Sequence, residues 1–197
     1  LGTEPSAATR AIYESLMQTD DSAKTPTSPL TTRGVTAPLI GRKAEWWRLQ
    51  AAWSKATTGH AHLVTLTGEA GIGKSRLAEE MKAWVSRLGM TAAHASCYMT
   101  LKNVAYAPVI SWMRSDALHT SLQALDALFL TEVARLVPEL LVTRPTLPHP
   151  TAMTEGWQRQ HFFEALARVI QHARHPLLLL LDDLHWCDQE TLDWLQY

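Results

Sequence analysis

Three glycines, a lysine and a serine stand at a fixed spacing in residues 68–75, and together these residue types can bind phosphate. The pattern G-x-x-x-x-G-K-[ST] is met at every fixed position by Gly68-Glu69-Ala70-Gly71-Ile72-Gly73-Lys74-Ser75. Glycine adopts positive φ easily, so several backbone N–H groups can turn toward one anion. The lysine offers a mobile charge to the β- and γ-phosphates, and the serine hydroxyl can bind Mg²⁺. The segment is predicted to be a P-loop (Walker A).

The neighbours of this loop have the order that a P-loop requires. Residues 62–67 alternate apolar and polar types, as a short buried strand does, and residues 76–85 have the spacing of a helix. The positive end of the helix dipole faces the same anion. We therefore expect residues 68–75, together with Arg76 at the helix start, to bind the nucleotide.

A second element of the site is expected at residues 176–183, an apolar run that ends in two acids. Strands buried on both faces of a parallel sheet have such runs. Ligands bind at the carboxyl ends of these strands, which puts Asp182 near the P-loop. Asp182 is predicted to hold Mg²⁺ with Ser75, mostly through water, and Asp183 to orient or polarise the attacking water. Two alternatives for Asp183 are a helix N-cap and a second metal ligand, while His185 either senses the γ-phosphate or bonds locally.

The remaining periodicity completes an α/β pattern. Helical spacing covers residues 43–56, 106–118, 122–142 and 157–172, and residues 90–97 form a weak strand after Gly89. One face of residues 43–56 carries Trp46, Leu49, Trp53 and Ala56, and its tryptophans are expected to pack on the sheet. Strands that alternate with helices favour a P-loop NTPase parallel sheet flanked by helices.

Two segments precede this domain. Residues 1–18 place Ala8, Ile12 and Leu16 on one helical stripe, and residues 19–37 are rich in Thr, Ser and Pro without an apolar period. We expect a short N-terminal helix, a flexible linker, and an ATPase domain over residues 38–197. Because the chain starts at Leu1, it is expected to be part of a longer protein.

Composition limits the classes of function. The 197 residues are 46% apolar, which fits a globular domain with a core, and the net charge of −1 is not that of a nucleic-acid-binding surface. Residues at the N-terminus do not show a basic flank followed by an apolar signal core, and no apolar run approaches the roughly 18 to 20 residues that span a bilayer, so we expect a cytoplasmic protein.

The two cysteines are expected to be small buried hydrophobes rather than a disulfide, because a reducing compartment is assumed. A zinc site is the alternative. Its ligands would be His94, Cys97, His185 and Cys187, but neither pair has a usual zinc spacing.

Five segments besides the P-loop resemble segments of a known protein family. These segments are Leu39-Ile40-Gly41-Arg42, Tyr106-Ala107-Pro108-Val109, Glu132-Val133-Ala134-Arg135-Leu136-Val137-Pro138-Glu139-Leu140, Thr154-Glu155-Gly156-Trp157-Gln158-Arg159-Gln160 and Leu181-Asp182-Asp183-Leu184-His185-Trp186-Cys187-Asp188. With the P-loop, they resemble the STAND class of AAA+-related signalling ATPases, and the match is close in bacterial transcriptional regulators. Residues 1–14 resemble the closing helix of the bacterial transcriptional activator domain, a TPR-like array.

The resemblance implies a nucleotide switch. ADP would hold a closed state, and ATP with a signal would produce an open state that self-associates. DNA would be bound only by a winged helix in an upstream region, outside this chain. Ile40 and Arg42 would lie near the adenine.

Three structural expectations come with the resemblance. Asp183 stands where AAA+ proteins have a catalytic Glu, so hydrolysis is expected to be slow, although many STAND proteins also have Asp there. Cys187 stands where the family usually has Ala. The AAA+ strand order 5-1-4-3-2 places strands 5 and 4 beside the P-loop strand, and both would follow Tyr197, so the sheet would be truncated after the Walker B strand.

The predicted function is an ATP-binding, slowly hydrolysing switch of a bacterial transcriptional regulator, with ATP/ADP and Mg²⁺ as cofactors. One alternative is an enzyme whose own turnover matters, or a STAND module attached to a nucleotide cyclase. Another is an interaction scaffold with a degenerate nucleotide site, although Lys74, Ser75 and Asp182 are intact.

Overall fold

A parallel pair of strands forms the sheet. The structure, a computed structural model, describes residues 41–197. Strand β1 spans Thr91–Ser96 and strand β2 spans Leu177–Asp182, with Ser96 opposite Asp182 in the register. Both strands lie where the sequence predicts them. The helix expected in residues 1–18, the linker expected in residues 19–37 and Ile40 lie outside the described residues.

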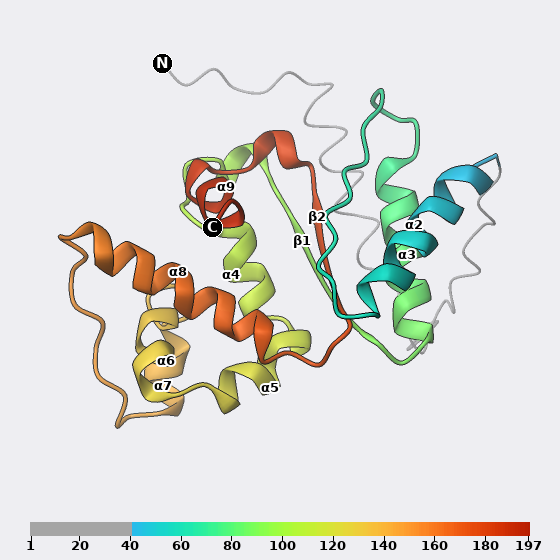
Figure 1. The fold of residues 1–197 in the computed structure, drawn as a ribbon. Helices are drawn as coiled ribbons and strands as arrows, with labels where there is room; N and C mark the ends of the chain where they lie inside the picture. Colours follow the sequence, from blue (N-terminus) through green and yellow to red (C-terminus); the bar gives the residue numbers. More distant parts are fainter. Residues whose placement is uncertain (1–40) are drawn as a thin grey trace, which may run out of the picture. The chain divides into compact units, whose positions relative to one another are not determined.

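The side chains of the two strands alternate between two hydrophobic clusters, one on each face. On one face Ala92 and Leu178 pack in a cluster with helices α2 (Lys43–Ala56) and α3 (Lys74–Arg87). The opposite face contributes Ala93, Ala95, Leu177, Leu179 and Leu181 to the larger cluster. Figure 1 shows α2 and α3 on one side of the strands and α4 and α8 on the other. The domain is thus an α/β fold with helices flanking a parallel sheet, as predicted.

Helices α2 and α3 pack against each other through one apolar stripe each. The buried residues of these stripes are Leu49, Trp53, Leu77, Met81 and Val85. Trp46 meets Trp84 edge to face, with ring centroids 5.8 Å apart. The predicted tryptophan face therefore packs on α3 as well as on the sheet. Gly89, with φ 73°, follows the end of α3, as a helix-terminating glycine does.

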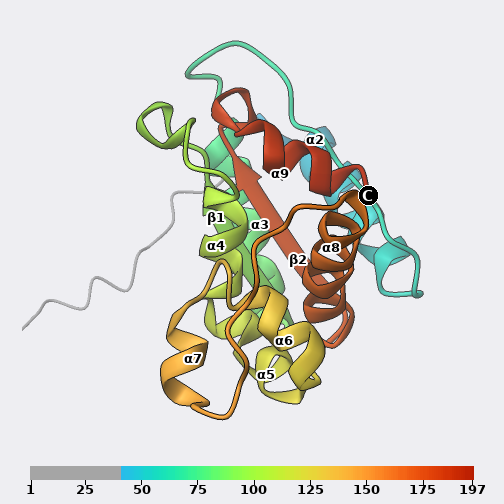
Figure 2. The same cartoon turned by 90° about the vertical axis from the view of Figure 1, so that its left-hand side faces the viewer.

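The helices on the other face are more numerous, and all of them except α8 are shorter than α2 and α3. They are α4 (Ala107–Met113), α5 (Asp116–Ala124), α6 (Ala127–Val133), α7 (Glu139–Thr143), α8 (Gly156–Gln171) and α9 (Gln189–Leu195), with 3₁₀ turns η2 (Met99–Leu101) and η3 (Leu184–Trp186). In both Figure 1 and Figure 2, α5, α6 and α7 lie below α8. Of the helices in residues 41–197, none is long and apolar enough to cross a membrane.

The two continuous helices predicted for residues 106–118 and 122–142 are wrong in extent. Each covers parts of two or three observed helices. The backbone is extended at Ser115 (ψ 150°) and Asp126 (ψ 149°), the N-cap positions of α5 and α6, and Pro138 holds the same position before α7. Ser and Asp favour such positions, but apolar spacing alone does not show where a helix is interrupted.

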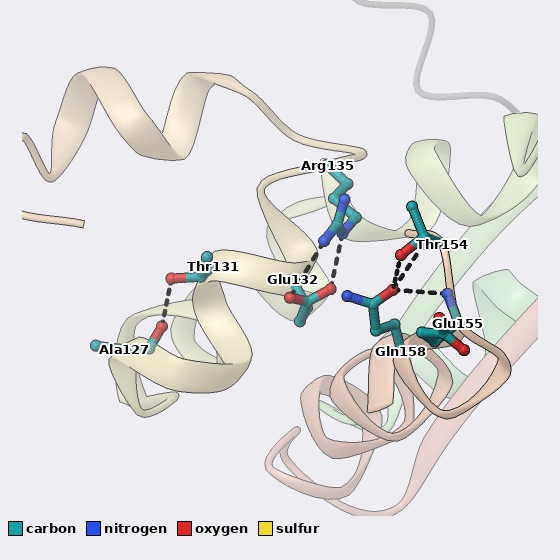
Figure 3. A network of polar contacts seen from close by, with 7 residues as sticks. All are labelled: Ala127, Thr131, Glu132, Arg135, Thr154, Glu155 and Gln158. Carbon is teal, nitrogen blue, oxygen red and sulfur yellow. Dashed lines mark hydrogen bonds and ion pairs between the residues drawn. The ribbon is translucent and has the colours of Figure 1, made fainter. Parts of the chain in front are cut away.

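The start of α8 is fixed by a polar network around Gln158. Its Oε1 accepts hydrogen bonds from the backbone N–H groups of Thr154 (2.7 Å) and Glu155 (2.9 Å), as Figure 3 shows. The same view contains the ion pair of Arg135 Nε with Glu132 Oε2, at 2.7 Å. The hydrogen bonds to Gln158 satisfy N–H groups at and before the N-cap of α8 and set where the helix begins.

The predicted buried strand at residues 62–67 is wrong. The segment forms no strand, and Leu63 is 96% exposed and Val64 47% exposed, while Leu66 alone packs partly against the α2–α3 cluster. In Figure 1 it runs in the same direction as β2 toward the P-loop. A strand needs a neighbouring backbone for its hydrogen bonds, and residues 41–197 supply none here. In the order 5-1-4-3-2 that the resemblance implies, residues 62–67 would be strand 1, β1 would be strand 2 and β2 would be strand 3. Strands 2 and 3 are neighbours in that order, as β1 and β2 are here. Strand 4 would lie between strands 1 and 3.

We predict that Phe162→Ala lowers the free energy of unfolding by about 3–5 kcal/mol, because it leaves a large cavity in the main cluster. Phe162 is 1% exposed and meets Tyr106 edge to face at 5.2 Å. Urea denaturation measures the change. The control is Leu128→Ala on α6, which is 65% exposed and should change stability by less than ~0.5 kcal/mol. Equal losses in both variants would contradict the described core.

Candidate functional site

The P-loop has a backbone that only glycine adopts without strain. Gly68, Gly71 and Gly73 have φ angles of 152°, 78° and 94°. At Gly68 a Cβ atom would also lie 3.3 Å from the Cγ2 atom of Ile72. The glycines of the motif therefore stand at positions whose local shape requires them.

Lys74 is the first residue of α3, and its ammonium lies across the loop. The Nζ atom donates to the carbonyl oxygens of Gly68 (3.0 Å) and Glu69 (2.9 Å). Gly73, at the N-cap, has no side chain that could accept from the first N–H groups of the helix, which include that of Ser75. The ammonium of Lys74, the N–H groups of the first turn and the positive end of the helix dipole lie at the same place, so the donors of this loop fit a phosphate.

The other predicted residues of the loop are open to solvent or bound to the helix. Ala70, Ile72 and Ser75 are exposed. Arg76 forms an ion pair with Glu80 on the next turn of α3, at 3.6 Å. The backbone and hydroxyl groups of the loop are thus accessible to a ligand.

Arg42 connects α2 to the P-loop. Its Nη2 atom donates to the carbonyl oxygen of Ile72 at 2.7 Å, and its Nη1 atom pairs with Glu45 Oε1 at 2.8 Å. A backbone hydrogen bond and then the Arg42 guanidinium lower the pKa of Glu45. The resemblance implies a place near the adenine for Arg42, and the structure puts its guanidinium on the backbone of the loop. Its expected partner Ile40 lies outside the described residues.

The two acids of the second motif follow each other at the carboxyl end of β2. The backbone N–H of Asp183 donates to Asp182 Oδ1 at 2.9 Å. Asp182 is on the same face of the strand as Leu178, which packs in the cluster of α2 and α3. Figures 1 and 2 show the P-loop and the carboxyl end of β2 at the same end of the sheet. The structure therefore brings the phosphate donors and Asp182 to one end of the fold.

Asp183 is exposed and has a left-handed backbone, with φ 55° and ψ 44°. It occupies the N-cap position of η3, yet its side chain caps no N–H group. The ring of His185 contacts its neighbour Trp186, with centroids 4.8 Å apart. The carboxylate of Asp183 is thus left accessible at the edge of the sheet.

Asp188 holds this end of the sheet together, a role that was not predicted from the sequence. It is 3% exposed, and it accepts hydrogen bonds from the backbone N–H groups of Tyr106 and Thr191, each at 2.8 Å, and from Thr191 Oγ1 at 2.8 Å. An Asp directly before a helix is a favoured N-cap residue, so the sequence carries a signal for the bond to Thr191. The bond to Tyr106, which has φ 60°, carries no such signal.

The four residues considered for zinc do not form a metal centre. Within residues 41–197, no three His, Cys, Asp or Glu side chains converge as ligands. Cys97 and Cys187 are buried free thiols, and His94 Nε2 lies 3.4 Å from Ser96 Oγ on β1.

Comparison with known proteins agrees with this geometry. Residues 38–197 match the family model of the AAA ATPase domain. The chain therefore belongs to the AAA ATPase domain family and contains a nucleotide-binding module. No curated protein and no solved structure matches the chain.

We predict that Asp188→Ala lowers the free energy of unfolding by about 3 kcal/mol, since it leaves buried donors of Tyr106 and Thr191 without an acceptor. Thermal and urea denaturation measure the loss. Asp193→Ala is the control on the same helix: Asp193 pairs at the surface with Arg159, at 2.6 Å, and its loss should change stability little. A stable Asp188→Ala protein would show that the buried network is dispensable.

Proposed function

We propose that this domain is an ATP-binding switch of the STAND class within a cytoplasmic bacterial transcriptional regulator. The observation that carries the proposal is the position of the P-loop donors at the start of α3, at the same end of the sheet as Asp182. The sequence resemblance of the segments around both motifs supports the particular class. The ligands are ATP and ADP with Mg²⁺.

Three side chains bind the nucleotide in this proposal. Lys74 exchanges its two carbonyl partners for the β- and γ-phosphates, which offer it more negative charge. The hydroxyl of Ser75 and the carboxylate of Asp182 are oxygen ligands of the type that Mg²⁺ prefers, with Asp182 acting mostly through water. Bound Mg²⁺ supplies charge neutralisation at the phosphate oxygens.

Asp183 orients or polarises the attacking water, and slow hydrolysis follows from its short side chain. Its φ of 55° lies in the left-handed region, which Asp adopts more readily than Glu. The backbone at this position therefore favours the residue with the shorter reach.

Arg42 is suited to carry the state of the loop toward the segments before the domain. It contacts Ile72 in the P-loop and stands directly before α2. We assign residues 1–18 to the end of a helical activator domain and residues 19–37 to a linker. A shift of the P-loop would then be transmitted along the chain through Arg42 to the linker. ATP binding favours self-association, and DNA is contacted only by domains outside this chain.

Calorimetry with Mg²⁺-ATP and Mg²⁺-ADP tests the proposal. We expect Lys74→Ala to weaken ATP binding by at least ~2 kcal/mol, because a charge-assisted phosphate contact is lost. Lys82→Ala, farther along the same helix, should bind as the unaltered protein does. If the unaltered protein does not bind either nucleotide, the site is degenerate and the scaffold function replaces the switch.

A second variant tests the role of Asp183. Asp183→Glu should raise the rate of ATP hydrolysis by about 10-fold, a small part of the roughly 10²–10⁴-fold that a well-placed general base contributes. It should also lower stability by about 1 kcal/mol, because Glu replaces Asp at a positive φ. Phosphate release under saturating ATP measures the first effect. Glu190→Asp on α9 is the matched control, and an unchanged rate in Asp183→Glu would remove the proposed role.

A further inference from the structure

Two polar residues of β1 lie on the face of the strand that turns toward the P-loop helix. His94 and Ser96 share a face with Ala92, because side chains alternate along a strand. Ala92 packs in the cluster of α2 and α3, and α3 is the helix that begins at the P-loop. Strand β1 ends at Ser96, so this face changes from apolar to polar toward the carboxyl end of the sheet, where Figures 1 and 2 show the P-loop.

Ser96 is the direct neighbour of Asp182 across the ladder. The two residues are partners in the parallel register, and the next N–H along β1, that of Cys97, donates to the carbonyl oxygen of Asp182 at 3.0 Å. Partner residues of neighbouring strands point to the same face, and such strands lie about 4.8 Å apart. The hydroxyl of Ser96 and the carboxylate of Asp182 therefore stand side by side, at a separation that one water can bridge.

The carboxylate of Asp182 is held at one oxygen only. Its Oδ1 atom accepts the backbone N–H of Asp183 at 2.9 Å, and no side chain of residues 41–197 donates to this carboxylate. A carboxylate can accept further hydrogen bonds, because its two oxygens offer about four lone-pair sites. A second contact is therefore needed to fix the direction in which Asp182 faces a ligand.

His94 is placed to orient the hydroxyl of Ser96. Its Nε2 atom lies 3.4 Å from Ser96 Oγ, in a half-buried contact. In the part of the chain that the structure describes, neither side chain has another hydrogen-bond partner. A ring N–H that donates to Oγ leaves the hydroxyl proton free, because a hydroxyl is donor and acceptor at once. The pair thus keeps one donor available for Asp182 or its water.

We propose that Ser96 and His94 are positioning residues of the Mg²⁺-nucleotide site, an inference that rests on the proposed function. The Ser96 hydroxyl donates to the water that it shares with Asp182, and His94 holds that hydroxyl in place. Asp182 then has a fixed direction toward Mg²⁺. Partners of this kind, which orient a metal ligand without touching the metal, are part of most metal sites.

Calorimetric titration of ATP into the full chain, once with Mg²⁺ and once with EDTA, tests the inference. We expect Ser96→Ala to weaken ATP binding about 10-fold with Mg²⁺, the low end of what the loss of an orienting partner costs in metal affinity. Binding in EDTA should not change, because the P-loop donors are intact. Ser96→Thr keeps the hydroxyl and should restore most of the loss. Ser111→Ala on α4 removes an exposed hydroxyl and is the matched control.

Two variants of His94 separate orientation from packing. His94→Gln keeps an N–H donor near the position of Nε2, so it should bind Mg²⁺-ATP nearly as the unaltered protein does. His94→Leu keeps a side chain of similar size without the donor, so it should lose affinity several-fold with Mg²⁺ and none in EDTA. If Ser96→Ala does not fold, as circular dichroism would show, this pair decides the question.

The possible results distinguish this inference from the proposed function. If the unaltered chain binds ATP neither with Mg²⁺ nor in EDTA, both are overturned. If it binds, the inference alone is overturned by any of three results. These are a folded Ser96→Ala that binds Mg²⁺-ATP as the unaltered protein does, an equal loss with Mg²⁺ and in EDTA, and equal binding by His94→Gln and His94→Leu.

Discussion

The parallel ladder between β1 and β2 is the constraint on which the rest of the described fold depends. Its register sets Ala92 and Leu178 toward α2 and α3. The residues adjacent to these two in each strand face the opposite way, toward the larger cluster. A slip of one residue would turn every side chain of the slipped strand to the opposite face. Asp182 would then leave the face that it shares with Leu178. The same backbone hydrogen bonds therefore hold both hydrophobic clusters and the acid of the site.

The P-loop depends on this ladder through a helix rather than through a strand. Residues 62–67 have no partner strand among residues 41–197, but α3 is anchored by Leu77, Met81 and Val85 in the cluster that reaches the sheet. The loop is thus held from its carboxyl side, and Arg42 adds a contact from α2. Segments with few buried contacts are the ones that open most easily, so a ligand can order this loop.

Sequence patterns were sufficient where one local property decides the structure. The glycine spacing predicted the P-loop, and five consecutive leucines before Asp182 predicted β2. Sequence patterns failed where the structure of a segment depends on other segments that are distant in the sequence. The alternation of residues 62–67 could not show that a ladder partner is missing, and the apolar period of residues 122–142 could not show the breaks at Asp126 and Pro138. The bond of Asp188 to Tyr106 likewise joins two segments that no local pattern connects.

The turn after β2 shows how such distant contacts set the backbone of Asp183, a residue of the candidate site. The carbonyl oxygen of Asp182 is bound by Cys97, and Asp188 is bound by Tyr106, so the turn between them is fixed at both ends by segments from β1 and α4. A short connection between fixed ends has few backbone solutions, and here it includes a left-handed Asp183. Because Asp tolerates that conformation better than Glu, the tethers themselves favour the shorter acid. The position of the Asp183 carboxylate is therefore set by the packing of β1 and α4 as much as by the motif that contains it.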